Sequence, residues 1–113
     1  DKFAKGIASL AESLEGKLVI YTKSGLTAMR VSSFRPKVKL IALSPSKEVR
    51  RRMAIIWGIK PMAVKAEEYD EGMEESLEVV KAKGEVSYGD IVVLTYGLRE
   101  PPSNVIKVIR MVS

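Results

Sequence analysis

The sequence predicts an α/β fold, a three-layer αβα sandwich around a five-stranded and mostly parallel sheet. Short apolar runs of strand length alternate with segments whose apolar residues recur every three or four positions, which is typical of β–α–β units. Such units form parallel sheets with right-handed crossovers and helices on both faces. The last two strands are joined by a segment too short for a helical crossover, so we expect the final strand to run antiparallel.

The first predicted helix covers residues 2–14 and ends near Gly16, and the first strand covers residues 17–22. The strand is predicted from the buried apolar run Leu18 to Tyr21. The inner face of the helix is marked by apolar residues at helical spacing, namely Phe3, Ile7, Leu10, Ala11 and Leu14.

The second helix is predicted to open at about Leu26 and to end before Pro36, because a residue that precedes proline disfavours the helical conformation. A second buried strand follows at residues 38–43. Ala28, Val31 and Phe34 are expected on the inner face of the helix.

The third helix is predicted to start at Ser44, as the N-cap, with Pro45 in the first helical position. It is expected to run to Trp57 and to be closed by Gly58, and a short strand follows at residues 60–65.

A charged stretch, residues 67–72, leads into the fourth helix, which carries Met73, Leu77 and Val80 on one side and ends at Gly84. A turn at residues 88–90 opens a strand over 91–95. A proline-containing loop, residues 96–104, then leads to the last strand at 105–112. With no internal repeat, residues 1–113 are predicted to be a single domain.

Composition excludes several classes of chemistry. The chain has 113 residues, 46% hydrophobic and 29% charged, with a net charge of +5 and neither Cys nor His. Disulfides, thiolate catalysis, Ser-His-Asp triads and the usual zinc sites are therefore excluded. No apolar run reaches the roughly 20 residues that span a bilayer.

No membrane or nucleic-acid partner is expected. Arg50, Arg51 and Arg52 lack interleaved aromatic residues and are interpreted as a solvated helix face. Without a signal-peptide pattern the location is predicted to be cytoplasmic, and a chain that opens on Asp1 suggests a fragment or a processed protein.

The segment between the first strand and the second helix has the composition of an anion-binding loop. Thr22, Ser24 and Thr27 offer hydroxyls, Lys23 offers a positive charge, and Gly25 lets the backbone approach a ligand closely. The free N–H groups and the positive dipole end of the following helix favour a phosphate there. No Walker or GxGxxG pattern is present, and a simple turn that starts the helix is the alternative.

Three further sets of residues are candidates for a functional role. Trp57 can be a binding platform, but packing of the end of the third helix is favoured. Arg99, in the 96–104 loop, can reach a phosphate with two hydrogen bonds. The carboxylates near the fourth helix are interpreted as solvated groups at an acidic helix N-terminus rather than a metal site, and these are Glu67, Glu68, Asp70, Glu71, Glu74 and Glu75.

The final strand, residues 105–112, is long and apolar for a free edge. An edge of this kind either pairs with another chain in an oligomer or stays in its own sheet, where Lys107 and Arg110 keep it soluble. Both interpretations remain open.

Taken in order, several segments resemble the C-terminal domain of pyruvate kinase over essentially the whole chain. Each segment is weakly specific alone, and the ordered combination is more specific. The segments are Val19–Ala28, Phe34–Pro36, Leu40–Leu43, Gly58–Pro61, Lys81–Gly84, Gly89–Thr95 and Asn104 with the strand that follows it.

The resemblance implies a domain without catalytic residues that binds a phosphorylated small-molecule effector and forms part of a tetramer interface. Phosphoryl transfer from phosphoenolpyruvate to ADP would then occur in a barrel domain with a lid, outside this chain, with Mg and K ions; no cofactor or metal is expected in this domain. The effector site implied by the resemblance comprises Thr22, Lys23, Ser24, Gly25 and Thr27, with Arg99 and Ser103 in the loop that closes over the sugar.

Departures from the family pattern disfavour fructose 1,6-bisphosphate. Leu26 replaces an Arg or another polar residue, and Gly72 lies near the position of an Arg that grips a second phosphate. The 96–104 loop carries Glu100, Pro101 and Pro102 in place of a glycine-rich run. A singly phosphorylated sugar, acid or nucleotide, or no effector, is expected instead.

Three functions stay open at this point. The first is the regulatory and oligomerisation domain of a pyruvate kinase. The second is a free-standing phosphometabolite-binding protein of the same fold, and the third is a purely structural oligomerisation module.

Overall fold

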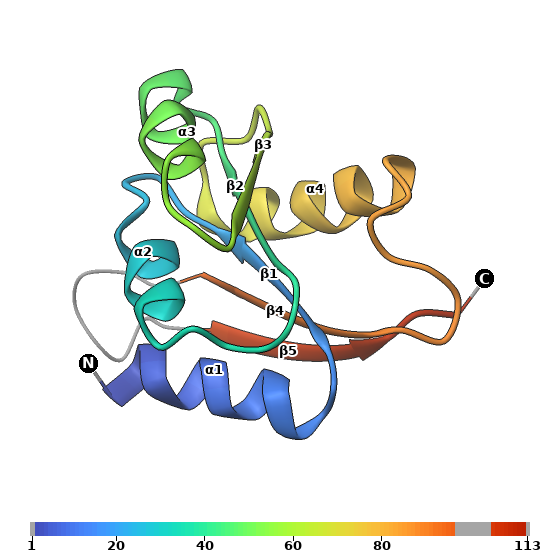
Figure 1. The fold of residues 1–113 in the computed structure, drawn as a ribbon. Coiled ribbons are helices and arrows are strands. Elements are labelled where there is room, and N and C mark those ends of the chain that lie inside the picture. Colours follow the sequence, from blue (N-terminus) through green and yellow to red (C-terminus); the bar gives the residue numbers. More distant parts are fainter. Residues whose placement is uncertain (1, 97–104, 113) are drawn as a thin grey trace.

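A computed structural model describes residues 2–96 and 105–112 of the chain. Within these residues, four helices surround one five-stranded sheet (Figure 1). The elements are α1 (Lys2–Ser13), β1 (Lys17–Tyr21), α2 (Leu26–Ser33), β2 (Leu40–Ser44), α3 (Lys47–Ala54), β3 (Ile59–Ala63), α4 (Tyr69–Ala82), β4 (Ile91–Tyr96) and β5 (Val105–Arg110).

The sheet has the strand order β3-β2-β1-β4-β5. The four strands β1 to β4 are mutually parallel, with Val19 of β1 paired with Ile41 of β2 on one side and Leu94 of β4 on the other. The last strand, β5, is antiparallel to β4, and Val93 pairs with Val108. The predicted fold class is therefore confirmed, including the reversed direction of the final strand.

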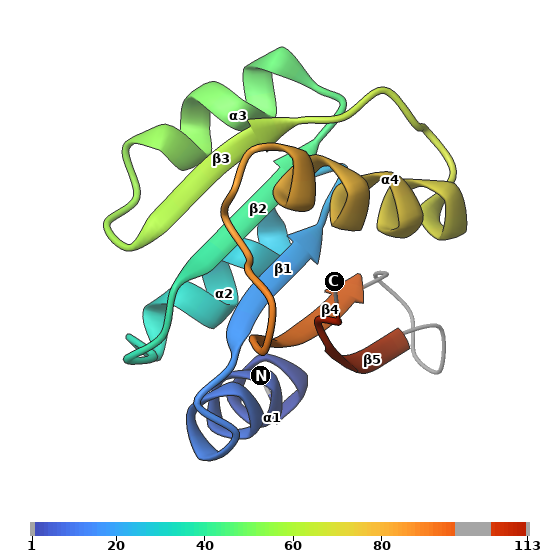
Figure 2. The same ribbon diagram turned by 90° about the vertical axis from the view of Figure 1, so that its right-hand side faces the viewer.

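Helices cover both faces of the sheet, so the fold has three layers (Figure 2). On one face, buried residues of α1, α2 and α3, such as Ile7, Val31 and Met53, pack against Leu18 and Ile20 of β1. On the other face, α4 packs alone through residues such as Met73 and Val80. Strand β1 is buried on both faces, which explains its unbroken apolar run.

The prediction for the start of the third helix is wrong by two residues. The N-cap of α3 is Ser46, whose hydroxyl accepts a hydrogen bond from the N–H of Val49 at 3.2 Å, and Ser44 ends β2. The Ser44 hydroxyl accepts the N–H of Ser46 instead. Two serines flank Pro45, and the one whose hydroxyl reaches the third residue onward acts as the cap.

Two aromatic residues also depart from the predictions. Phe34 follows α2 as its C-cap and is 41% exposed, so it does not belong to the inner face of that helix. Helix α3 ends at Ala54 rather than at Trp57, and Trp57 is 76% exposed. The predicted packing of Trp57 against neighbouring structure is therefore wrong.

The fourth helix starts earlier than predicted. It begins at Tyr69, so Gly72, which was predicted to lie in the segment before the helix, lies inside α4. Among the four helices of residues 2–96, none has the length and apolar character needed to cross a membrane.

Candidate functional site

The candidate loop, residues 22–25, leaves the sheet at the carboxyl end of β1, between the parallel strands β2 and β4. The Thr22 N–H donates to the carbonyl of Leu43 at 2.9 Å, which extends the ladder with β2 by one residue. The Thr22 side chain is buried, and its Oγ1 accepts the N–H of Gly25 at 2.8 Å. Thr22 therefore holds the loop in a tight turn and presents no hydroxyl to solvent.

Gly25 is required at the start of α2 for two reasons. Its φ of 84° lies in the left-handed region, which a residue with a side chain adopts only at a cost. A Cβ at this position would also lie 3.1 Å from Cγ1 of Val49, on α3. The absence of a side chain at residue 25 thus lets α3 support the loop from below.

The first N–H groups of a helix have no acceptors within the helix. In α2, Oγ of Ser24 accepts the N–H of Leu26 at 3.2 Å, while the N–H groups of Thr27 and Ala28 meet no acceptor within the part of the chain that the structure describes. Ser24 is exposed and Thr27 half-buried, so both hydroxyls lie near these donors at the surface. The predicted residues 22–27 therefore form one compact, donor-rich turn.

Lys23 brings a positive charge to this turn. Its Nζ lies 5.4 Å from the ring centroid of Tyr69, in a cation–π contact. None of the carboxylates within residues 2–96 and 105–112 forms an ion pair with it. Among the described groups, an anion that approaches Lys23 would therefore compete with a tyrosine ring and with no carboxylate.

A cluster of three tyrosines, which was not predicted from the sequence, supports the loop. Tyr69, at the start of α4, contacts Tyr21 edge-on at a centroid distance of 5.7 Å and Tyr96 at 5.1 Å. All three residues lie at the carboxyl end of the sheet or at the helix start beside it. The missed signal is that Tyr21 and Tyr96 each end a parallel strand at this edge.

The phenols of this cluster are held as hydrogen-bond donors. Tyr21 donates to the carbonyl of Ala66 at 2.6 Å, and burial, reinforced by the carboxylate of Glu67, raises the pKa of Tyr21 to about 12. Tyr96 donates to Asp70 at 3.1 Å, and its pKa is raised by burial and by that carboxylate. Both groups keep their protons at neutral pH.

Gly72 packs its Cα directly against the ring of Tyr21, and a Cβ at that position would overlap the ring. No residue with a side chain fits at position 72 unless Tyr21 moves. Two of the carboxylates near the start of α4 have structural partners: Asp70 accepts the hydroxyl of Tyr96, and Glu75, inside α4, accepts the N–H groups of Lys65 and Ala66 at about 3 Å.

Two predicted site residues, Arg99 and Ser103, lie outside the described residues, as do all of residues 97–104; Tyr96, the first residue of the predicted effector loop, is instead the last residue of β4. Among the residues that the structure does describe, no group of three or more acidic side chains is placed to hold a metal ion.

The opposite end of the sheet carries a different cluster of charges. Glu85, in the α4–β4 connection, pairs with Lys39 and Lys60, and the two lysines lower the pKa of Glu85 to about 2. Lys17 donates to Asp90 at 2.8 Å and to the carbonyl of Glu85 at 2.9 Å. We call Lys17, Lys39, Lys60, Glu85 and Asp90 the lysine clamp.

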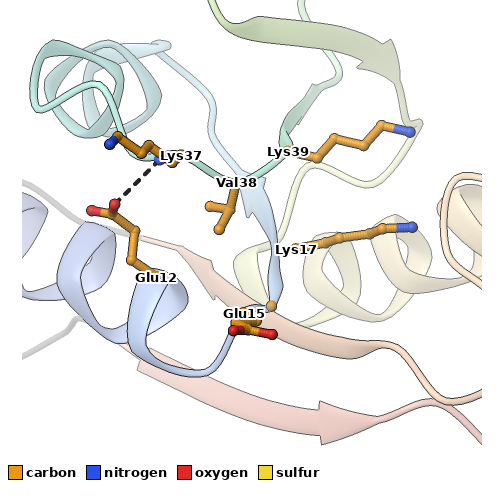
Figure 3. Close-up of a pocket in the computed structure, with 7 residues that line it drawn as sticks. Glu12, Glu15, Lys17, Lys37, Val38 and Lys39 are labelled. Carbon is orange, nitrogen blue, oxygen red and sulfur yellow. Dashed lines mark hydrogen bonds between the residues drawn. The ribbon is translucent and has the colours of Figure 1, made fainter.

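Beside the lysine clamp lies a cavity of about 450 Å³ between α1 and the segment that precedes β2. Figure 3 shows Lys17 and Lys39 extending in the same direction, away from Glu12, which accepts the backbone N–H of Lys37 at 3.4 Å. The ammonium groups of Lys17 and Lys39 are already paired with the carboxylates of the clamp. Glu12 and Glu15 also line the cavity, against one further lysine, Lys37, so this cavity is a poor site for an anion.

Comparison with known proteins gives one consistent result. The family model described as "Pyruvate kinase, alpha/beta domain" matches residues 1–109. The pyruvate kinase of Pyrobaculum aerophilum is 34% identical over 99 residues, which are 88% of this chain and 20% of that protein. The pyruvate kinase of Clostridium acetobutylicum is 36% identical over 107 residues, 93% of this chain and 22% of that protein.

Solved structures agree with this result. The crystal structure of the Pyrobaculum aerophilum pyruvate kinase superposes with a TM-score of 0.75 at 31% identity, covering 98% of this chain and 22% of that one. Cryptosporidium parvum pyruvate kinase in complex with ADP gives 0.78 at 26% identity, covering 95% and 22%. The chain thus spans about a fifth of the length of these relatives. It belongs to the pyruvate kinase family and corresponds to the C-terminal alpha/beta domain of that family.

Proposed function

We propose that this chain is the effector-binding and assembly domain of a longer pyruvate kinase polypeptide, and that residues 22–27 hold the phosphate of an effector. Transfer of phosphate from phosphoenolpyruvate to ADP would be performed by parts of the polypeptide outside this chain, which would also hold the Mg and K ions. A cytoplasmic location is part of this proposal. The observation that carries it is the turn itself, where an unpaired lysine, two surface hydroxyls and free helix N–H groups converge.

The contacts of the loop suggest how each residue acts. Lys23 supplies charge, and the hydroxyls of Ser24 and Thr27 can donate to phosphate oxygens because a hydroxyl can donate while it also accepts. The N–H groups of Thr27 and Ala28 lie in the first turn of α2, at the positive end of its dipole. Thr22 and Gly25 shape the loop, since one is buried and the other packs on α3.

We propose an effector with a single phosphate. Gly72 is pressed against Tyr21, so no cationic side chain can project from that point of α4 toward a second phosphate. Regulation would follow from linkage: an effector that binds one arrangement of subunits more tightly shifts the assembly toward it, typically by ~1–3 kcal/mol.

The two edges of the sheet support an assembly through β5. At the β3 edge, Pro61 has no N–H, and the N–H of Ile59 is taken by Ile56. The N–H of Val64 donates to the carbonyl of Ser44 on β2. Since alternate residues of a strand bond to opposite sides, Ile59 and Pro61 face away from β2, and the outer edge of β3 offers few N–H donors to another strand. On β5, Ile106 and Val108 are 44% and 51% exposed beside an open edge, which fits pairing with a second copy.

The phosphate site is tested by Ser24→Asp, with ligand binding measured by titration calorimetry. The ligands are phosphate, AMP, glucose 6-phosphate, 3-phosphoglycerate and fructose 1,6-bisphosphate. A carboxylate in the turn repels phosphate, so we expect at least a tenfold loss of affinity for the ligand that binds, equal to about 1.4 kcal/mol. Ser9→Asp, at an exposed position of α1, is the matched control and should bind normally.

The alternatives give other results. No binding by the unmodified chain would favour a structural oligomerisation module. Binding by a natural protein of only 113 residues would favour a free-standing phosphometabolite-binding protein. Unchanged binding by the Ser24→Asp variant would show that the ligand sits elsewhere.

A further inference from the structure

Large apolar side chains are exposed together at the amino end of β3. Ile55 is 85% exposed and Trp57 is 76% exposed, both in the connection between α3 and β3. The Arg35 guanidinium lies 6.0 Å from the Trp57 ring centroid, and Phe34 is next to it in the chain. We call Phe34, Arg35, Ile55 and Trp57 the Trp57 patch.

The Trp57 patch also has a recess. A cavity of about 70 Å³ opens between Trp57 and the end of α2, lined by Ser32, Pro36, Val38 and Leu40 among others. Its lining is largely apolar, and its volume suits one small apolar side chain. An exposed tryptophan beside an apolar recess is the arrangement of an interface anchor, and Trp and Arg are the residues most enriched at such anchors.

The charge around the Trp57 patch restricts what can cover it. Arg51 and Arg52 are exposed one helical turn before Ile55, and neither forms an ion pair with a carboxylate of residues 2–96 or 105–112. With Arg35, which contacts the Trp57 ring, they put three guanidinium groups at the Trp57 patch and on the helical turn before Ile55. A symmetric contact between two copies would bring these arginines close to the same arginines of the second copy, and the like charges would repel each other. The charge therefore selects an acidic partner surface.

We propose that the Trp57 patch is the docking surface for the remainder of the same polypeptide, which presents an apolar side chain rimmed by carboxylates. The inference rests on the proposed function, in which this chain is one domain of a longer protein. The relatives are about five times as long as the region they share with this chain, so a large partner domain is always present at high effective concentration. Arg35, Arg51 and Arg52 would then lose their solvent exposure and gain carboxylate partners.

The test is hydroxyl-radical footprinting read by mass spectrometry, on the natural full-length protein and on the 113-residue chain. Tyr88 is the internal control, because it is 78% exposed and lies on another surface. In the full-length protein we expect oxidation of Trp57 to fall roughly tenfold relative to the isolated chain, since an interface core excludes water. Oxidation of Tyr88 should stay unchanged.

A double variant tests the charge. Arg51→Glu with Arg52→Glu in the full-length protein should restore oxidation of Trp57. Lys81→Glu with Lys83→Glu, in the last turn and at the C-cap of α4, should leave Trp57 protected. Equal oxidation of Trp57 in both proteins would overturn the inference and leave the proposed function standing. Protection that appears in the isolated chain as its concentration rises would also overturn it, in favour of a second copy. A natural protein of 113 residues would overturn both proposals.

Discussion

The two ends of the parallel sheet carry lysines in opposite circumstances. At the amino end, Lys17, Lys39 and Lys60 all pair with carboxylates of the α4–β4 connection. At the carboxyl end, Lys23 contacts only the ring of Tyr69 among the described groups. Paired lysines tie three strands to one connection, whereas an unpaired lysine beside free helix N–H groups can receive an anion.

This difference shows how to separate structural charge from functional charge. The amino end has the larger count of lysines and a cavity of about 450 Å³, and by those measures it is the stronger anion site. Lys17, Lys39 and Lys60 are already paired with Asp90 and Glu85, so these charges contribute to stability. Ligands of parallel α/β sheets bind at the carboxyl ends of the strands, where the dipoles of following helices converge.

The largest effect on stability is expected for Gly72→Ala, which lies against Tyr21 at the carboxyl end of the sheet. The new methyl group would overlap the Tyr21 ring and displace the tyrosine cluster, so we expect a loss of roughly 2–3 kcal/mol in the free energy of unfolding. Gly6→Ala is the matched control in α1, where a Cβ meets nothing within 4 Å.

Denaturant unfolding should find Gly6→Ala stabilised by about 0.5–1 kcal/mol, from helix propensity alone. If both variants were stabilised equally, the close packing of α4 on Tyr21 would be contradicted.

A smaller effect is expected for Glu85→Gln, at the amino end. Loss of the carboxylate leaves Lys39 and Lys60 unpaired, and because both lysines are partly exposed the cost should be roughly 1 kcal/mol. Glu78→Gln, whose pair with Lys81 at 3.7 Å is exposed, should change stability by less than about 0.5 kcal/mol. Urea denaturation of both variants measures the difference.

The same carboxylate predicts a pH dependence. The pKa of Glu85 is lowered from 4.5 to about 2 in the folded chain, so its stabilisation is complete above pH 4.5. It is lost as the pH falls from about 4.5 to about 2, because the unfolded chain binds the proton first. Urea denaturation at a series of pH values across this range should show that the free energy of unfolding falls less with pH for Glu85→Gln than for the unmodified chain. Parallel pH dependences of the two proteins would contradict the lysine clamp.

The smallest effect on stability is expected for Lys23→Met. An exposed lysine with only a ring contact contributes little, so the free energy of unfolding should stay within about 0.5 kcal/mol. Lys39→Met, its counterpart in the lysine clamp, should be the less stable of the two variants in thermal unfolding. The reverse order would contradict the contrast between the two ends.

Sequence patterns predicted most of the fold because they report burial directly. The run at 18–21 and the apolar spacing of α1 correspond to surfaces that the sheet covers. Phe34 and Trp57 were misplaced because apolar character alone does not distinguish a side chain packed inside the domain from one exposed on its surface. The cap of α3 was misplaced because Ser44 and Ser46 are both plausible caps and hydrogen-bond geometry decides between them.

The candidate site was predictable in its main segment and not in its surroundings. Residues 22–27 are contiguous, so their composition alone predicts a donor-rich turn. Tyr21, Tyr69 and Tyr96 come from separate elements and meet only after the sheet is assembled. The pairing of three lysines with Glu85 and Asp90 likewise depends on strand order, which brings residues 17, 39 and 60 to one edge.

The most direct test of the contrast between the two ends is an NMR amide-shift titration of the chain with phosphate and the four phosphometabolites named above. We expect saturable shifts concentrated at residues 22–28 with at least one ligand, and none at Lys17, Lys37 or Lys39. Shifts concentrated at those three lysines, with residues 22–28 silent, would contradict it.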